Sequence, residues 1–107
     1  MVRRLTETNW YDYLLWFRAR DEWSFDVDGV DFRVVNHWIG STALLKGATE
    51  LAQVTKLIEL SGKSPVLQAI VRTNSDRQRS IAIYFKGHFT VTMKVEVDGN
   101  DISNGFI

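Results

Sequence analysis

The chain has 107 residues, no cysteine, and thirteen basic against thirteen acidic residues, so its formal net charge is zero. A chain of this length can bury a sufficient core as one domain, and the absence of cysteine excludes disulfides, thiolate nucleophiles and cysteine-ligated metals while favouring the cytoplasm. Because the charges balance and no apolar run is long enough to span a bilayer, neither an overall field nor a membrane anchor is expected.

A first helix is predicted from Trp10 to Arg20, with Thr6 or Thr8 as its capping residue. Apolar side chains recur along it at the i, i+3, i+4, i+7 spacing of a packed helical face: Trp10, Tyr13, Leu14 and Phe17. Three more apolar side chains flank this stripe: Tyr11, Leu15 and Trp16. A helix that is apolar on several sides must bury more than one of them, against its own sheet or against a partner.

A β-hairpin is predicted from Glu22 to Val35, because Asp28-Gly29 is the sequence of a two-residue type I′ turn. With this turn, large apolar side chains face one another in three pairs: Val27 with Val30, Phe25 with Phe32, and Trp23 with Val34. The opposite face is polar and places Asp26 beside Asp31.

A second helix is predicted from Ser41 or Thr42 to about Ser61, after a connection that contains His37 and Trp38. Its inner stripe is mostly apolar: Leu44, Gly47, Leu51, Val54, Thr55 and Ile58. Gly62 and Pro65 end it in the usual way. In the alternative, Gly47 breaks the helix and residues 41–46 form a separate short turn.

A strand is predicted from Val66 to Thr73, and its continuous apolar character indicates burial on both faces. A central hairpin follows from Ser80 to Val97, in which apolar and polar residues alternate. A three-residue turn at residues 86–88 pairs its apolar face as follows: Phe85 with Phe89, Ile83 with Val91, and Ile81 with Met93. A further turn is predicted at residues 98–101, before a short tail.

The predicted order is helix, two strands, helix, three strands (α-β-β-α-β-β-β). Such an order predicts one α+β domain over residues 1–107, with a mostly antiparallel sheet and two helices packed on one of its faces.

Candidate catalytic residues are few. His37 and His88 fall in separate loops of the predicted structure, and no cysteine exists to pair with either. Asp26 and Asp31 are close, but an EF-hand reading fails because Val35 stands where a bidentate Glu is required. A small hydrolase or metal site around Asp26 and Asp31 is therefore the last-ranked hypothesis, and we expect neither enzymatic activity nor a cofactor.

The leading hypothesis is a small non-enzymatic protein-binding module, an inhibitor, adaptor or subunit. The chain has four tryptophans, and Trp, Tyr and Arg are enriched at interface hot spots. The predicted binding surface is aromatic and comes mainly from the first helix: Tyr11, Leu15, Trp16 and Trp38. The partner would be another protein or a second copy of the chain. The alternative is that these rings complete a large core.

Nucleic-acid binding is the second hypothesis. Basic residues and one outward tyrosine gather at one end of the predicted sheet: Arg72, Arg77, Arg79 and Tyr84. Arginine beside an exposed ring can hold a single strand by charge and stacking. Asp76 interrupts the group, and the zero net charge weakens the expectation.

Overall fold

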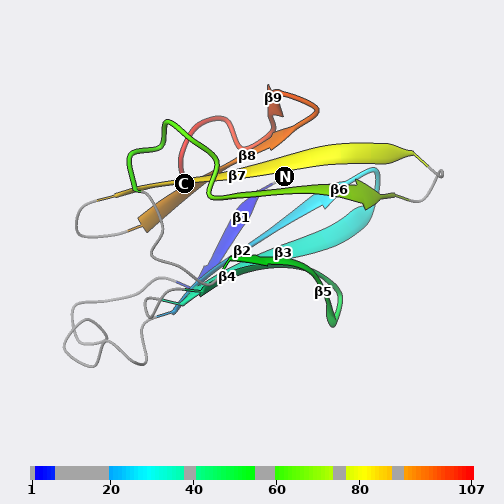
Figure 1. The fold of residues 1–107 in the computed structure, drawn as a ribbon, viewed down its shortest axis with the longest axis horizontal. Coiled ribbons are helices and arrows are strands. Elements are labelled where there is room, and N and C mark those ends of the chain that lie inside the picture. The colour runs from blue at the N-terminus through cyan, green and yellow to red at the C-terminus, as the bar shows by residue number, and fades with distance from the viewer. Residues whose placement is uncertain (1, 7–19, 38–40, 55–59, 74–76, 88–90) are drawn as a thin grey trace.

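The computed structural model describes residues 2–6, 20–37, 41–54, 60–73, 77–87 and 91–107. Within these residues the chain forms nine strands and no helix, and the strands make two antiparallel sheets (Figure 1). The described part is therefore all-β, and the predicted α+β class is wrong. No helix in that part is long and apolar enough to cross a membrane.

Sheet A has the order β1 (Arg3–Thr6), β2 (Arg20–Val27), β3 (Val30–His37), β4 (Ser41–Lys46) and β5 (Thr49–Val54). Sheet B has the order β6 (Leu67–Arg72), β7 (Gln78–Gly87), β8 (Val91–Val97) and β9 (Asn100–Asp101). Neighbours in each sheet are also neighbours in sequence, so each sheet is a simple meander.

The first predicted hairpin is confirmed. Asp28 and Gly29 have φ values of 52° and 80°, the positive values that both central residues of a type I′ turn require. The β2–β3 register pairs the residues as predicted: Val27 with Val30, Phe25 with Phe32, Trp23 with Val34, and Asp26 with Asp31. Local turn chemistry and alternation were sufficient to define this unit.

The second predicted helix is wrong. Residues 41–54 form the β4–β5 hairpin instead, and Gly47, with a φ of 61°, lies in its turn. Gly47 therefore interrupts the segment, as in the alternative prediction that it breaks the helix. However, strands flank it on both sides, and residues 41–46 form a strand and not a turn. Along β4, Thr42 and Leu44 are buried at alternate positions, because pairing with β3 gives this segment one face toward the core. Tertiary pairing overrides the helix propensity of its Ala, Leu and Lys residues.

Residues 10–19 of the first predicted helix lie outside the described part of the chain. Its last residue, Arg20, opens β2.

The central hairpin exists, but its predicted register is wrong. β7 and β8 pair four residues further along than expected: Phe85 with Met93, Ile83 with Val95, and Ile81 with Val97. A shift by an even number keeps every side chain on its face, so burial alone does not choose between these registers. Phe89 lies outside the described residues.

β6 is not buried on both faces. Leu67 and Val71 are buried, whereas Gln68, Ile70 and Arg72 are exposed, because β6 is an edge strand with one face toward the core. At the opposite edge, the carboxyl-terminal tail covers β8, since Met93 and Ile107 exchange two backbone hydrogen bonds of 2.9 and 3.0 Å. The predicted turn at Asp98 is confirmed, with a φ of 52°.

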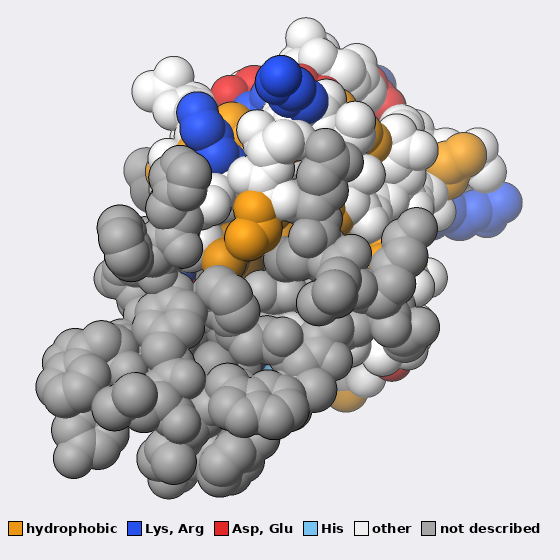
Figure 2. Space-filling model, turned by 60° about the vertical axis from the view of Figure 1, so that its left-hand side comes forward, with side chains coloured by type: hydrophobic (Ala, Val, Ile, Leu, Met, Phe, Trp, Pro, Cys, Tyr) orange, Lys and Arg blue, Asp and Glu red, His pale blue; other side chains and the backbone are white. Residues whose placement is uncertain are grey.

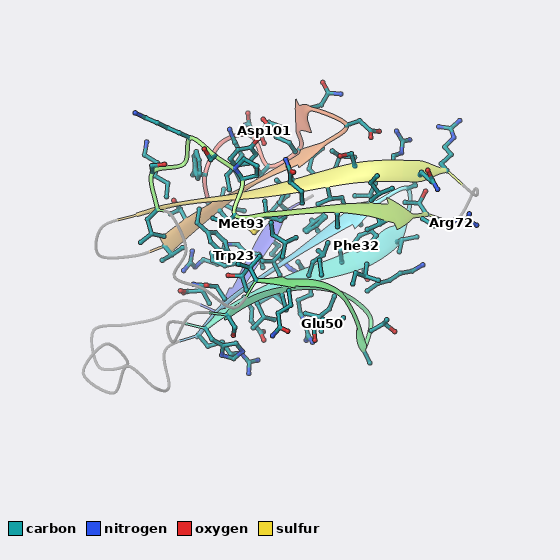
Figure 3. The ribbon with its side chains drawn as sticks, in the orientation of Figure 1. Trp23, Phe32, Glu50, Arg72, Met93 and Asp101 are labelled. Atoms are coloured by element: carbon teal, nitrogen blue, oxygen red, sulfur yellow. The ribbon has the colours of Figure 1, made fainter. Side chains whose placement is uncertain are left out.

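The two sheets pack face to face around one apolar core, with Trp23, Phe32 and Met93 between them (Figure 3). Sheet A, together with Val2 just before it, contributes the buried side chains of Val2, Trp23, Phe25, Val27, Val30, Phe32, Val34 and Leu44. Sheet B contributes those of Leu67, Val71, Ile81, Ile83, Phe85, Val91, Met93, Val95 and Val97. This arrangement is a β-sandwich, in which alternate residues of each strand fill the interior and leave two outer faces in contact with solvent.

Candidate functional site

The predicted aromatic binding surface cannot be placed. Its four residues, Tyr11, Leu15, Trp16 and Trp38, lie outside the described part of the chain, as does His88. That surface therefore stays a prediction. His37 is described and is an exposed residue at the end of β3.

The predicted nucleic-acid patch is not assembled. Arg72 and Arg77 are exposed at one end of sheet B (Figure 3 labels Arg72). Tyr84 lies six residues along β7 from Gln78, the partner of Arg72, which corresponds to about 20 Å of strand. Its hydroxyl donates a 2.9 Å hydrogen bond to Glu96, and this bond together with burial raises the pKa of Tyr84.

The last member of that patch, Arg79, has a structural partner. Its guanidinium donates two hydrogen bonds to the Asp28 carboxylate, at 3.0 and 3.2 Å, and one to Asp98 at 2.8 Å. Asp28 belongs to the β2–β3 turn of sheet A, and Asp98 to the β8–β9 turn of sheet B. One arginine therefore clamps two similar Asp-Gly turns together across the end of the sandwich. Thr73 also donates a 2.8 Å hydrogen bond to Asp28.

This clamp gives the fold a predictable pH dependence. Hydrogen bonds from Arg79 and Thr73 lower the pKa of Asp28, and hydrogen bonds from the Ser80 amide and Arg79 lower the pKa of Asp98. Because both folded-state pKa values lie below the unfolded value of about 3.9, the stabilisation is fully present above that pH. It is lost as pH falls through the folded-state pKa values.

We therefore expect Arg79→Gln to lower the Tm at pH 7, and the difference from the wild type to shrink as the pH is lowered below about 4. Thermal unfolding followed by circular dichroism at several pH values measures both effects. Arg72→Gln, an exposed arginine of the same sheet, is the control and should leave the Tm nearly unchanged. A Tm difference for Arg79→Gln that is constant across this pH range would contradict the clamp.

Asp26 and Asp31 are cross-strand neighbours on the outer face of sheet A, as predicted. Within the described ranges, however, no group of three or more His, Asp or Glu side chains is arranged to hold a metal ion. The pair therefore forms part of a polar surface, together with the residues that surround it.

That surface is the candidate site. Ser24 on β2 pairs with Arg3 on β1 and with Arg33 on β3, so the three residues form one row across the outer face of sheet A. Strands in a sheet are spaced about 4.8 Å apart, which puts the α-carbons of the two arginines about 10 Å apart. Asp31 lies two residues from Arg33 along β3, in the next row.

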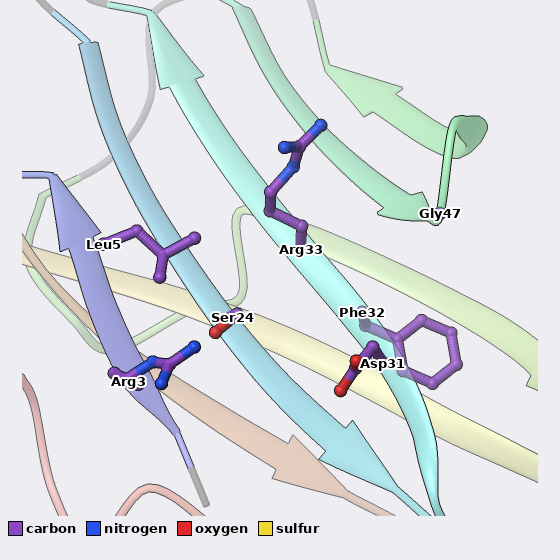
Figure 4. A pocket seen from close by; sticks show the side chains of 7 residues that line it. All are labelled: Arg3, Leu5, Ser24, Asp31, Phe32, Arg33 and Gly47. Atoms are coloured by element: carbon purple, nitrogen blue, oxygen red, sulfur yellow. The ribbon is translucent and has the colours of Figure 1, made fainter.

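The small Ser24 side chain leaves a shallow hollow of about 250 Å³ on this face, with Arg3, Leu5, Asp31 and Arg33 among its lining residues. In Figure 4 Arg3 extends over the hollow toward Ser24, and Asp31 lies on the other side of β2. Arg33 extends away from Ser24, so its guanidinium lies farther across the face. A molecule lying across the strands along this row would meet Arg3, Ser24 and Arg33 in turn, with Asp31 in the next row of β3.

Neither Arg3 nor Arg33 has an ionic partner in the described part of the chain. Both are exposed, and among the described residues no carboxylate lies within ion-pair distance of the guanidinium of Arg3 or Arg33. A guanidinium offers a planar set of donors that matches a carboxylate or phosphate with two parallel hydrogen bonds. Chemically, the face is therefore suited to binding an anionic group by charge and hydrogen bonding.

The outer face of sheet B differs in this respect. The Lys94 ammonium lies 4.5 Å from the ring centre of Tyr84, 5.3 Å from that of Phe106, and 3.7 Å from Glu96. Basic and acidic side chains lie next to one another over this sheet, at the top of Figure 2. The charge of Lys94 is thus balanced by Glu96 within the fold.

Comparison with known protein families, characterised proteins and solved structures gives no match. The candidate site accordingly depends on geometry alone.

The sequence predicted only some of the residues of this site. Strand alternation places Ser24, Asp31 and Arg33 on the outer face of the first hairpin. The sequence did not predict that Arg3 lies beside them, because β1 and β2 are separated in the chain and no local pattern indicates that they pair.

Proposed function

We propose that the protein is a non-enzymatic protein-binding module that contacts an acidic segment of its partner through the outer face of sheet A. The observation that carries this proposal is the pair of exposed arginines, Arg3 and Arg33, on either side of Ser24. The absence of cysteine supports a cytoplasmic setting for the interaction.

The position of the two arginines favours recognition over simple solvation. Arg3 and Arg33 are in strands of a five-stranded sheet, so their α-carbons are held by cross-strand hydrogen bonds. Binding groups on rigid elements lose less entropy when a partner arrives. The exposed Leu5 beside Arg3 adds apolar area, which is the mixture of Arg and apolar contact that interfaces use.

The test uses a fluorescein-labelled hexaglutamate peptide as the probe and fluorescence anisotropy as the readout at low ionic strength. The Arg3→Glu, Arg33→Glu double variant should bind at least about tenfold more weakly than the wild type, a loss of about 1.4 kcal/mol. Binding by the wild type should also weaken as salt is added.

The matched control is the Arg72→Glu, Arg77→Glu double variant, which makes the same change in net charge on exposed arginines of sheet B. It should keep the wild-type affinity. Equal losses in both double variants would mean that the peptide senses only net charge, and absence of binding at low salt would also overturn the proposal.

A further inference from the structure

At one edge of sheet B, no other described strand pairs with β6. The Thr73 amide donates to the Arg77 carbonyl at 3.0 Å, which makes these two residues a hydrogen-bonded pair of the β6–β7 ladder. Hydrogen-bonded pairs alternate with non-hydrogen-bonded pairs along an antiparallel ladder. The peptide groups of Gln68, Ile70 and Arg72 therefore point away from β7, toward the open edge.

The other edges of the described sandwich are protected, as natural sheet edges usually are. The β1–β2 register shifts between Arg4 and Thr6, and the β4–β5 register shifts between Leu44 and Leu45, so both outer strands of sheet A are irregular. β8 is covered by β9 and by the tail that ends at Ile107. β6, in contrast, pairs with β7 in a regular register, and within the described residues no strand pairs with its other side.

An exposed apolar side chain marks the middle of this edge. Ile70 is 74% exposed, more than any other large hydrophobic side chain among the described residues. Leu51, at 39%, belongs to β5, which lies beside β6 on the same side of the sandwich. A regular, uncovered edge strand with an exposed isoleucine is the kind of edge that pairs with another strand.

We propose that β6 pairs antiparallel with β6 of a second copy, so that two four-stranded sheets join into one continuous sheet across a twofold axis at Ile70. In this register Ile70 faces Ile70 of the second copy, and Gln68 faces the second copy's Arg72. All three outward-pointing residues then form hydrogen-bonded pairs, with about six backbone hydrogen bonds across the axis.

Charge and hydrogen bonding select this register over its neighbours. Centring the axis on Arg72 would place the two Arg72 side chains opposite each other, which is repulsive. Centring it on Ala69 would place Ile70 opposite Gln68 and leave Arg72 without one of these three residues as its partner. Centring it on Val71 would place Ile70 opposite Arg72 and leave Gln68 without one. Of these registers, the one about Ile70 makes the segment self-complementary, as a twofold interface requires.

Sedimentation equilibrium of the full chain is the first test. The wild type should be dimeric at micromolar concentration, and Ile70→Lys should weaken dimerisation at least tenfold, because it places two ammonium groups at the axis. Leu5→Lys introduces the same charge at an exposed apolar position of sheet A, and should leave the dimer unchanged. A wild type that stays monomeric, or a dimer that Ile70→Lys does not weaken, would overturn the proposal.

Oxidative cross-linking tests the register, since the chain has no cysteine of its own. Hydrogen-bonded antiparallel pairs have α-carbons about 5.5 Å apart, within disulfide reach, so Ile70→Cys should form a covalent dimer under mild oxidation. Gln68→Cys is the control, because the two Gln68 residues would be offset by four residues, about 13 Å. Cross-linking of Gln68→Cys as fast as Ile70→Cys would contradict this register.

The inference is independent of the acidic-peptide site, which lies on the other sheet. Ile70→Lys should therefore leave binding of the hexaglutamate probe unchanged.

Discussion

Replacing Arg4 by methionine is expected to destabilise the fold by about 3–5 kcal/mol, the usual cost of removing one partner from a buried ion pair. The Arg4 guanidinium lies 2.7 Å from the Asp21 carboxylate, whose side chain is only 1% exposed. It also donates a 2.7 Å hydrogen bond to the Val91 carbonyl of sheet B and lies 4.9 Å from the ring centre of Trp23. One side chain thus links β1, β2 and β8.

Urea unfolding measures this loss as a change in midpoint at constant slope. Arg33→Met makes the same substitution at an exposed position of sheet A and should change stability by less than about 0.5 kcal/mol. The Arg4→Met, Asp21→Asn double variant should recover part of the loss, because it no longer buries a carboxylate charge that has lost the Arg4 guanidinium. Arg4→Met within about 0.5 kcal/mol of the wild type would show that the pair does not stabilise the fold.

The second large effect is expected at Trp23, the largest fully buried side chain among the described residues. It is fully buried, its ring lies 5.4 Å from that of Phe85 in the opposite sheet, and its indole N–H donates a 3.1 Å hydrogen bond to the Ile107 carbonyl. Trp23→Ala removes this packing and leaves a cavity, so a loss of about 3–5 kcal/mol is expected. Since domains of this size are stable by about 5–15 kcal/mol, the variant will be close to unfolding.

Trp23→Phe separates the two contributions. It keeps an aromatic ring against Phe85 and removes one of the two donors to the Ile107 carbonyl, which still accepts from the Met93 amide. The lost hydrogen bond should cost about 0.5–1.5 kcal/mol, less than Trp23→Ala. Leu51→Ala, at a 39% exposed position, is the control and should cost about 1 kcal/mol or less. Equal losses for Trp23→Ala and Leu51→Ala in urea unfolding would contradict the assignment of Trp23 to the centre of the core.

Strand alternation by itself predicted part of the candidate site. Alternation along the first hairpin places Asp26, Asp31 and Arg33 on the same outer face, and the structure confirms their placement. Arg79 shows the limit, because its partners are Asp28, 51 residues away, and Asp98, 19 residues away. The sequence alone does not predict such an ion pair, because only the folded chain brings the two turns next to Arg79.

The sequence by itself determined those features that depend on residues close together in the chain. Asp28-Gly29 defined a hairpin and its register, because a type I′ turn and the alternation beside it act within a few residues. Only the tertiary structure decided that residues 41–54 are strands and that Phe85 faces Met93. Helical and strand spacings overlap in short apolar segments, and even shifts of register preserve burial, so the choice depends on neighbouring strands that are distant in the chain.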